Sequence, residues 1–167
     1  EGLLLLDGCT KADVQIVKNF IERTLKRPFK DLKLVISTHS HPDHAGGLST
    51  FKSLGIPIAG PKELGKEYRG IRGTMLYFTD ILLTYLVALN KKKKMKNIFY
   101  PKTIDLNFVL SEGDTIPGFN SWTVLETPGH TKIDLSLFNK KSETIYVADN
   151  FVGNSKKVYR PYPIQSP

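Results

Sequence analysis

One short segment, residues 37–47, holds most of the side chains that are suited to metal chemistry. It contains His39, His41, Asp43 and His44, so three of the chain's four histidines and a carboxylate lie within six positions. Residues two apart in an extended segment point to the same side, so His39 and His41 can reach one cation. A turn at Pro42 then leaves Asp43 and His44 facing an adjacent position. The spacing predicts a metal site, for which zinc is suited and for which iron or manganese accept the same donors.

The other candidate residues follow predicted strands. His130 lies in a Thr-Pro-Gly-His-Thr segment directly after a strand expected over 121–126, Asp149 follows a strand expected over 144–148, and Asp7 follows the apolar run 3–6. A lone histidine at a strand end is more often an ordinary polar residue than a ligand. However, α/β folds place their sites at the carboxyl ends of strands, so these three positions become site candidates together.

Apolar runs and breakers alternate along the chain, which is typical of strands interleaved with helices. The 167 residues suit one domain, and we predict an α/β (α+β) fold over 1–167. Helices are expected over 12–26, 46–54 and 61–68, and strands over 3–6, 32–36, 56–59, 108–110, 121–126, 135–138 and 144–148, the last two joined by a turn at 139–142.

The segment 75–89 is unusual because Asp80 is its one charged residue, and Lys91 to Lys94 and Lys96 follow at once. A membrane-spanning helix needs about 20 apolar residues, so this run is too short and no membrane span is predicted. An apolar helix that covers the domain or a partner subunit is expected instead, with a homodimer through 75–89 as one outcome. Residues 69–102 are thus predicted to be an apolar helix and a lysine-rich loop, inserted between the metal motifs.

The net charge of +8 invites an acidic partner, but residues 88–102 alone contribute +6 through six lysines and no acid. A single solvated loop explains this surplus better than a basic face, and two nearby aromatic residues are too few for a base-stacking platform. Nucleic acid is therefore not an expected partner. The one cysteine, Cys9, excludes an intrachain disulfide framework and a cysteine-only zinc site, and it suits a reducing, cytoplasmic location.

In their order along the chain, these motifs resemble those of the metallo-β-lactamase-fold superfamily. The matching segments are Leu-Leu-Asp-Gly at 5–8, His-x-His-x-Asp-His at 39–44 with glycines at 46 and 47, Thr-Pro-Gly-His-Thr at 127–131, and Ala-Asp at 148–149. The resemblance implies an αββα four-layer sandwich, here incomplete. It also implies that His39, His41 and His130 bind a first metal, Asp43 and His44 a second, and that Asp149 bridges both. Asp7 and Thr131 would then orient the ligands without binding metal themselves.

The chain departs from the family pattern at its carboxyl end. The family supplies a last histidine some tens of residues after the bridging aspartate, and this chain ends 18 residues after Asp149 without one. The apolar run 3–6, which begins two residues after Glu1, points the same way at the other end. We expect the sequence to be truncated at both ends, and a complete protein to carry a further histidine downstream.

The resemblance also implies a reaction. Two zinc ions would hold a hydroxide that attacks a small-molecule ester, thioester or lactone, and Asp43 would handle the proton. The Pro-Gly-His-Thr form resembles the glyoxalase II-like and lactonase-like branch. Against a close lactonase identity, Val152 stands where that group has a phenol.

Two alternatives from other reaction classes remain open. His39, His130 and Asp149 would suffice for a mononuclear iron persulfide dioxygenase of the same superfamily, because two histidines and one carboxylate suit non-haem iron. A metal-dependent nuclease or phosphodiesterase is motivated by the net charge alone.

Overall fold

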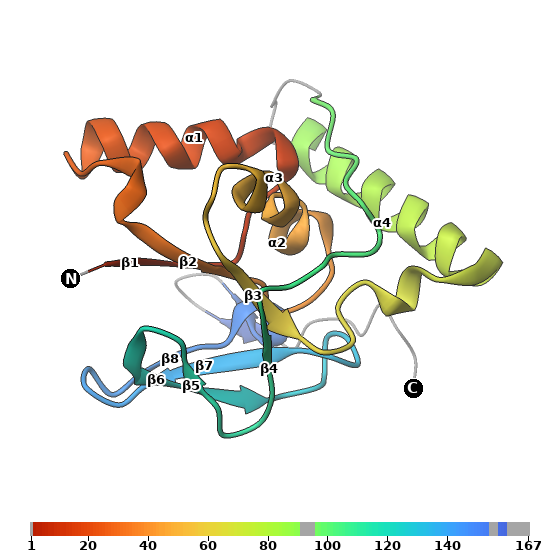
Figure 1. Ribbon diagram of the computed structural model, residues 1–167. Helices are drawn as coiled ribbons and strands as arrows, with labels where there is room; N and C mark the ends of the chain where they lie inside the picture. Colours follow the sequence, from red (N-terminus) through yellow and green to blue (C-terminus); the bar gives the residue numbers. More distant parts are fainter. Residues whose placement is uncertain (1, 91–95, 154–156, 160–167) are drawn as a thin grey trace.

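Two four-stranded sheets form the middle of the molecule, and helices cover one of them (Figure 1). The computed structural model describes residues 2–90, 96–153 and 157–159. The first sheet is parallel, with the order β1 (Leu3–Leu6), β2 (Leu32–Ile36), β3 (Ile58–Pro61) and β4 (Phe108–Leu110). The second is antiparallel, with the order β5 (Thr115–Ile116), β6 (Phe119–Glu126), β7 (Leu135–Asn139) and β8 (Thr144–Tyr146). A separate pair, β9 (Val152–Gly153) and β10 (Val158–Tyr159), is antiparallel.

The helices lie on the side of the first sheet that faces away from the second sheet (Figure 1). They are α1 (Val14–Asn19), extended by short helical turns at Lys11–Asp13 and Phe20–Thr24, α2 (Pro42–Ala45), α3 (Leu48–Ser53) and α4 (Gly70–Asn90). Short 3-10 turns occur at Phe29–Asp31, Lys66–Tyr68 and Ala148–Asn150. The described residues thus form three of the four layers of the predicted αββα sandwich, in the order helix, sheet, sheet. Within these residues, no helical layer covers the outer face of the second sheet.

The first sheet is buried on both faces, which explains why its strands are apolar without alternation. On β2, Val35 packs toward the helices with Phe51, whereas Leu34 packs toward the second sheet. Val124 and Leu137 lie across from Leu34 in the core between the sheets. Two cores therefore hold the strand ends in place from opposite sides.

Most predicted elements are confirmed, and the differences have local causes. The helix expected over 61–68 is wrong, because β3 continues to Pro61 and a turn then leads to the single 3-10 turn Lys66–Tyr68. The strand expected over 56–59 is shifted to Ile58–Pro61, where it pairs with β2 and β4. The short helix α2 was not expected. It starts at Pro42, whose fixed φ suits a first helical position.

Helix α4 corrects the length argument made from the sequence. It has 21 residues rather than 15, so by length and composition it could cross a membrane. Of its most apolar 18-residue stretch, 22% is buried inside the protein. Its inner side nevertheless packs on the domain, where Gly73, Tyr77, Asp80 and Ile81 are buried. One such helix is weak support for a span, and α4 is a packed element of this fold.

The loop after β1 lies directly against the backbone of α2 and of the loop that follows it. The amide of Gly8 donates to the carbonyl of His44 at 2.6 Å, and the amide of Gly47 donates to that of Cys9 at 2.9 Å. A Cβ atom at Gly47 would lie 2.2 Å from the carbonyl oxygen of Gly8. The glycine is therefore required for the close approach of the loop after β1 to the loop after α2.

Substitution of this glycine is expected to destabilise the fold. Gly47→Ala should lower the free energy of unfolding by about 1–3 kcal/mol, because the backbone must move to admit the methyl group. Urea unfolding followed by circular dichroism measures the change. Ser49→Ala, two residues further along in α3, where the side chain is half-buried, is the matched control. A Gly47→Ala chain as stable as Ser49→Ala would contradict the packing described.

Candidate metal centre

The predicted ligands come together where the strand ends of both sheets meet. Asp7 follows β1, and His39 lies three residues after β2. His130 comes from the loop between β6 and β7, and Asp149 lies in the 3-10 turn after β8. The carbonyl of Thr38 accepts a hydrogen bond from the amide of Leu135 at 3.1 Å, which fastens the β2 loop to the second sheet.

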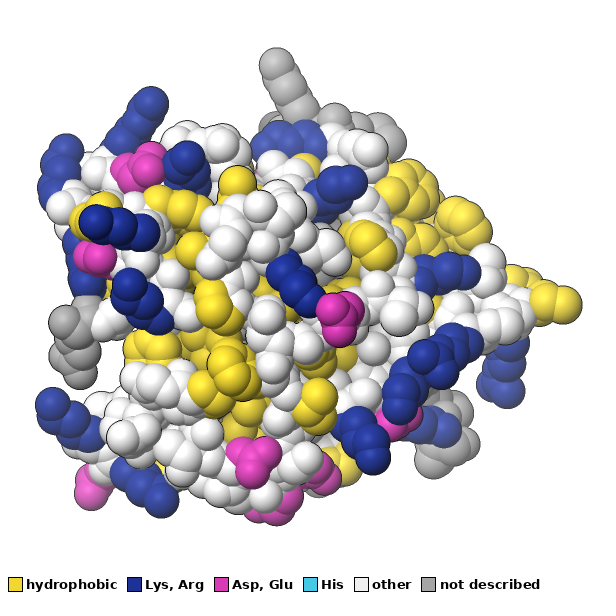
Figure 2. All heavy atoms as spheres, viewed as in Figure 1, with side chains coloured by type: hydrophobic (Ala, Val, Ile, Leu, Met, Phe, Trp, Pro, Cys, Tyr) yellow, Lys and Arg dark blue, Asp and Glu magenta, His cyan; other side chains and the backbone are white. Residues whose placement is uncertain are grey.

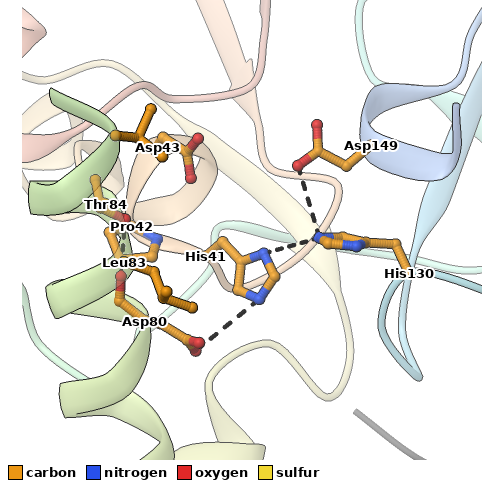
Figure 3. Close-up of a pocket in the computed structure, with 9 residues that line it drawn as sticks. His41, Pro42, Asp43, Asp80, Leu83, Thr84, His130 and Asp149 are labelled. Carbon is orange, nitrogen blue, oxygen red and sulfur yellow. Dashed lines mark hydrogen bonds and ion pairs between the residues drawn. The ribbon is translucent and has the colours of Figure 1, made fainter. Parts of the chain in front are cut away.

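Three imidazoles face a common point. Nδ1 of His41 lies 3.0 Å from Nε2 of His39 and 3.0 Å from Nε2 of His130. Oδ2 of Asp149 lies 3.6 Å from Nε2 of His130 (Figure 3). One ligand atom from each of these four residues falls within 4.8 Å of the others. The structure therefore brings together His39, His41, His130 and Asp149.

The electrostatics of this group suit a cation. Burial and the neighbouring imidazoles hold the pKa of His39 well below its usual value. Burial, with the imidazoles of His130 and His44, lowers the pKa of His41 to about 3. Neutral imidazoles direct lone pairs into the same space, and two ligands at about 2.0 Å from a tetrahedral zinc would be about 3.3 Å apart. The donor set and its spacing thus fit a zinc-like ion.

A second group surrounds His44. Its Nε2 lies 3.4 Å from Oδ2 of Asp149 and 3.7 Å from Oδ2 of Asp43, while its Nδ1 lies 2.8 Å from Oδ2 of Asp7. Burial by itself lowers the pKa of His44, but hydrogen bonds to Asp149 and Asp7 outweigh it and raise the pKa to about 11. The hydrogen bond from His44 in turn lowers the pKa of Asp149. Asp149 therefore faces both groups, and Asp43, with its side chain 57% exposed, stands at the solvent side.

Asp7 connects these candidate ligands to three strands. Its Oδ1 accepts hydrogen bonds from the amide and the hydroxyl of Thr38 at 2.8 and 3.0 Å. Its Oδ2 accepts one from the hydroxyl of Tyr146, on β8, at 2.6 Å. The Thr38 hydroxyl also lies 2.9 Å from Nδ1 of His39. Asp7 thus contacts His44 directly and His39 through Thr38, while Thr38 and Tyr146 were not singled out from the sequence.

Thr131 acts on the loop rather than on a ligand. Its amide and hydroxyl donate to the carboxylate of Asp134 at 2.6 and 2.8 Å, and the amide of Gly129 donates to the same carboxylate at 3.1 Å. Oδ1 of Asp134 lies 3.9 Å from Nδ1 of His39. Sequence reasoning missed Asp134, although an acid four residues after His130 was a usable signal. This buried carboxylate shapes the turn that presents His130.

Asp80 is a further carboxylate at the site that sequence reasoning noted only as a charge in an apolar run. It comes from α4, and its Oδ2 accepts a hydrogen bond from the hydroxyl of Tyr68 at 2.8 Å. The same oxygen lies 3.9 Å from Nε2 of His41 (Figure 3). Within the described residues, Oδ1 of Asp80 and Nε2 of His41 are buried without a hydrogen-bond partner. Burial raises the pKa of Asp80. The contact places an acid behind His41, where such groups orient metal-binding imidazoles.

Comparison with known proteins identifies the family. A profile described as the metallo-beta-lactamase superfamily matches residues 1–164, so the chain belongs to the metallo-β-lactamase superfamily. It is 29% identical over 133 residues to the probable metallo-hydrolase YqjP of Bacillus subtilis, and this match covers 75% of this chain and 41% of that protein. It is 25% identical over 142 residues to the human acyl-coenzyme A thioesterase MBLAC2, with 84% of this chain and 48% of that protein covered.

A third relative is the N-acyl homoserine lactonase of Bacillus thuringiensis, which is 30% identical over 124 residues, with 73% of this chain and 38% of that protein covered. The chain thus spans less than half the length of these relatives. Among solved structures, the FEZ-1 metallo-beta-lactamase of Legionella gormanii aligns with a TM-score of 0.61 at 19% identity, covering 95% of this chain and 51% of that one. At that identity the likeness shows the fold, and the predicted fold class is confirmed.

The role of Asp7 as a support for the ligands can be tested by its amide. Asp7 has a φ of 65°, a left-handed conformation that asparagine also tolerates, so Asp7→Asn removes charge without new backbone strain. Zinc affinity, measured by chelator competition, is expected to fall roughly 10–100-fold, because His44 and Thr38 lose their anionic partner. Tyr146→Phe keeps the carboxylate and should change the affinity less. Equal effects of the two variants would contradict this role.

Asp80 gives a separate prediction. Asp80→Asn should weaken zinc binding by about 10-fold, because the acid facing Nε2 of His41 is lost. Tyr68→Phe removes the hydrogen bond to Asp80 but leaves its charge, and should have the smaller effect. Zinc titration at one fixed pH compares the three proteins, and unchanged affinity in Asp80→Asn would show that Asp80 serves packing alone.

Proposed function

We propose that this chain carries the metal-binding part of a hydrolase that cleaves an ester, thioester or lactone bond in a small molecule. The observation that carries the proposal is the convergence of His39, His41, His130 and Asp149 on one point. The relatives named as a thioesterase and as lactonases support the bond type.

We assign the ligands in two sets. His39, His41 and His130 would hold a first metal, Asp43 and His44 would contribute to a second, and Asp149 would face both. Zinc is the expected ion, and iron or manganese accept the same donors. A metal bound here would polarise the bond under attack and lower the pKa of a water molecule. That the site binds two metal ions rather than one is part of this proposal.

The chain's own residues would bind and orient the substrate. The pocket at the site has a polar side with His41, His130 and Asp149, and an apolar wall from α4 with Leu83 and Val87. Such a division fits a substrate with a polar reacting group and an apolar arm. Asp43 lines the same pocket and is the most exposed of the carboxylates, so it would accept or return a proton at its mouth.

Three finer expectations belong to the same proposal. Residues 69–102 would form an insertion that supplies the pocket wall. Asp7 would hold the ligands in place directly, and Thr131 would do so through the turn that carries His130. A cytoplasmic location stays a prediction.

A second candidate function rests on a specific observation. Within the described residues, one group of potential ligands was found, and it includes His39, His130 and Asp149. Two histidines and a carboxylate would be enough for a mononuclear iron dioxygenase that acts on persulfides. Phosphodiester hydrolysis stays a prediction with no such support.

Metal content and activity of matched variants test the proposal. The chain loaded with zinc should hydrolyse members of a panel of acyl thioesters and lactones. His130→Ala should reduce zinc affinity and this activity by more than the roughly 10–100-fold caused by loss of a ligand-orienting group. Lys132→Ala, an exposed neighbour in the same loop, is the control and should leave both unchanged.

The same measurements separate the two candidates. Zinc-dependent hydrolysis that disappears in His130→Ala supports the hydrolase. One iron per chain with oxygen uptake on a persulfide substrate supports the dioxygenase and contradicts the first proposal. Hydrolysis that persists in His130→Ala would contradict the assigned site.

A further inference from the structure

Helix α4, the turn before it and the segment after it each bury one tyrosine. Figure 2 shows hydrophobic side chains gathered over α4 at the right of the view, where its outer side is exposed. Tyr68, Tyr77 and Tyr100 are buried instead. A buried phenol costs free energy unless its hydroxyl has a hydrogen-bond partner. The partners of these three hydroxyls therefore indicate what the tyrosines do.

The three tyrosines pack on one another, and we call them the tyrosine cluster. The ring centroids of Tyr68 and Tyr77 are 5.3 Å apart, and those of Tyr77 and Tyr100 are 5.4 Å apart. The hydroxyl of Tyr77 donates to the carbonyl of Tyr100 at 2.8 Å and accepts from the amide of Tyr100 at 3.0 Å. Tyr77, on α4, thus fixes the backbone of Tyr100 and with it the position of the Tyr100 ring.

The tyrosine cluster contacts the segment 39–41, which carries two candidate metal ligands, at its middle residue, Ser40. The carbonyl of Ser40 accepts a hydrogen bond from the hydroxyl of Tyr100, and the hydroxyl of Tyr68 lies 3.3 Å from the same carbonyl. The hydroxyl of Ser40 accepts a hydrogen bond from the amide of Gly65 at 2.9 Å. Both polar groups of this buried residue that accept hydrogen bonds are therefore held by the chain between β3 and β4.

A phenol has one hydrogen to donate, which gives the two tyrosines different partners. The hydroxyl of Tyr68 is closer to Oδ2 of Asp80, at 2.8 Å, than to the carbonyl of Ser40, so its hydrogen goes to Asp80. Oδ2 of Asp80 in turn lies 3.9 Å from Nε2 of His41. Tyr100 is then the donor that holds the Ser40 carbonyl. The tyrosine cluster reaches the ligand segment at two points, through Asp80 at the imidazole of His41 and through Ser40 at the backbone.

We propose that Tyr100 is a positioning residue for the metal centre, which acts through the carbonyl of Ser40 to hold the loop 39–44 in its ligand-binding shape. A loop that already has this shape loses less conformational entropy when a cation binds. The inference rests on the proposed metal ligands and goes beyond their assignment. It gives the predicted insertion 69–102 a second role beside the pocket wall, because Tyr100 lies near its end and 60 residues from Ser40.

Tyr100→Phe tests the proposal, because it keeps the ring and removes the hydroxyl. Tyr85→Phe is the matched control, since the hydroxyl of Tyr85 on α4 also donates to a backbone carbonyl, that of Lys96 at 2.6 Å, outside the loop 39–44. Zinc affinity, measured by chelator competition, should fall roughly 10-fold in Tyr100→Phe and stay unchanged in Tyr85→Phe. The visible absorption of the cobalt(II)-loaded chain reports ligand geometry, so it should change in Tyr100→Phe alone.

Hydrogen exchange of the metal-free chain gives a readout that does not depend on zinc. Mass spectrometry should show faster exchange over residues 37–47 in Tyr100→Phe than in the unchanged chain or in Tyr85→Phe, because the loop loses a restraint. Urea unfolding establishes that both variants are folded. Exchange that rises equally over the whole chain would show a general loss of stability and would overturn the proposal.

The failure of this proposal can be told apart from failure of the proposed function. Equal exchange over 37–47 and equal zinc affinity in Tyr100→Phe and Tyr85→Phe, with zinc still bound by the unchanged chain, would overturn the role of Tyr100 alone. An unchanged chain that binds no zinc would overturn the metal centre itself and, with it, this role.

Discussion

The buried carboxylate of Asp7 is the contact on which the site depends. It accepts hydrogen bonds from Thr38, beside His39, and from Tyr146 on β8, and it lies 2.8 Å from Nδ1 of His44. Strands of both sheets and two candidate ligands thus share one anion. Since a buried anion is costly unless it is fully paired, these groups keep their places only together. The fold and the site therefore stabilise each other through the same residue.

In the candidate metal centre, in contrast to the paired carboxylate of Asp7, buried imidazoles are kept neutral. His39, His41 and His130 are crowded at 3.0 Å separations, and burial keeps His39 and His41 neutral. Such a group has unsatisfied lone pairs, so binding a cation would offset the cost of its burial. His44, held between Asp7 and Asp149, has a strongly raised pKa. The two groups differ because carboxylates surround His44 and imidazoles surround His41.

Helix α4 links this chemistry to the surface. Its inner side delivers Asp80 to His41 and anchors to Tyr68 and Tyr100, while its outer side leaves a row of apolar residues uncovered. The sequence predicted an apolar helix here, but periodicity alone could not separate an inner from an outer side. Only packing on α2 and the tyrosines decided which residues face inward.

The sequence by itself determined the family, the order of most strands and helices, and the cluster 39–44, because local spacing and strand-end position carry that information. It could not show that His130 and Asp149 reach the same point, since their approach depends on two sheets packing with a common edge. Asp134 forms local hydrogen bonds with Gly129 and Thr131 that the sequence could have suggested, and only its approach to His39 depends on the tertiary fold. Tyr146 and Asp80 were missed because their contacts with Asp7 and His41 join segments far apart in the chain, and tertiary structure alone brings those segments together.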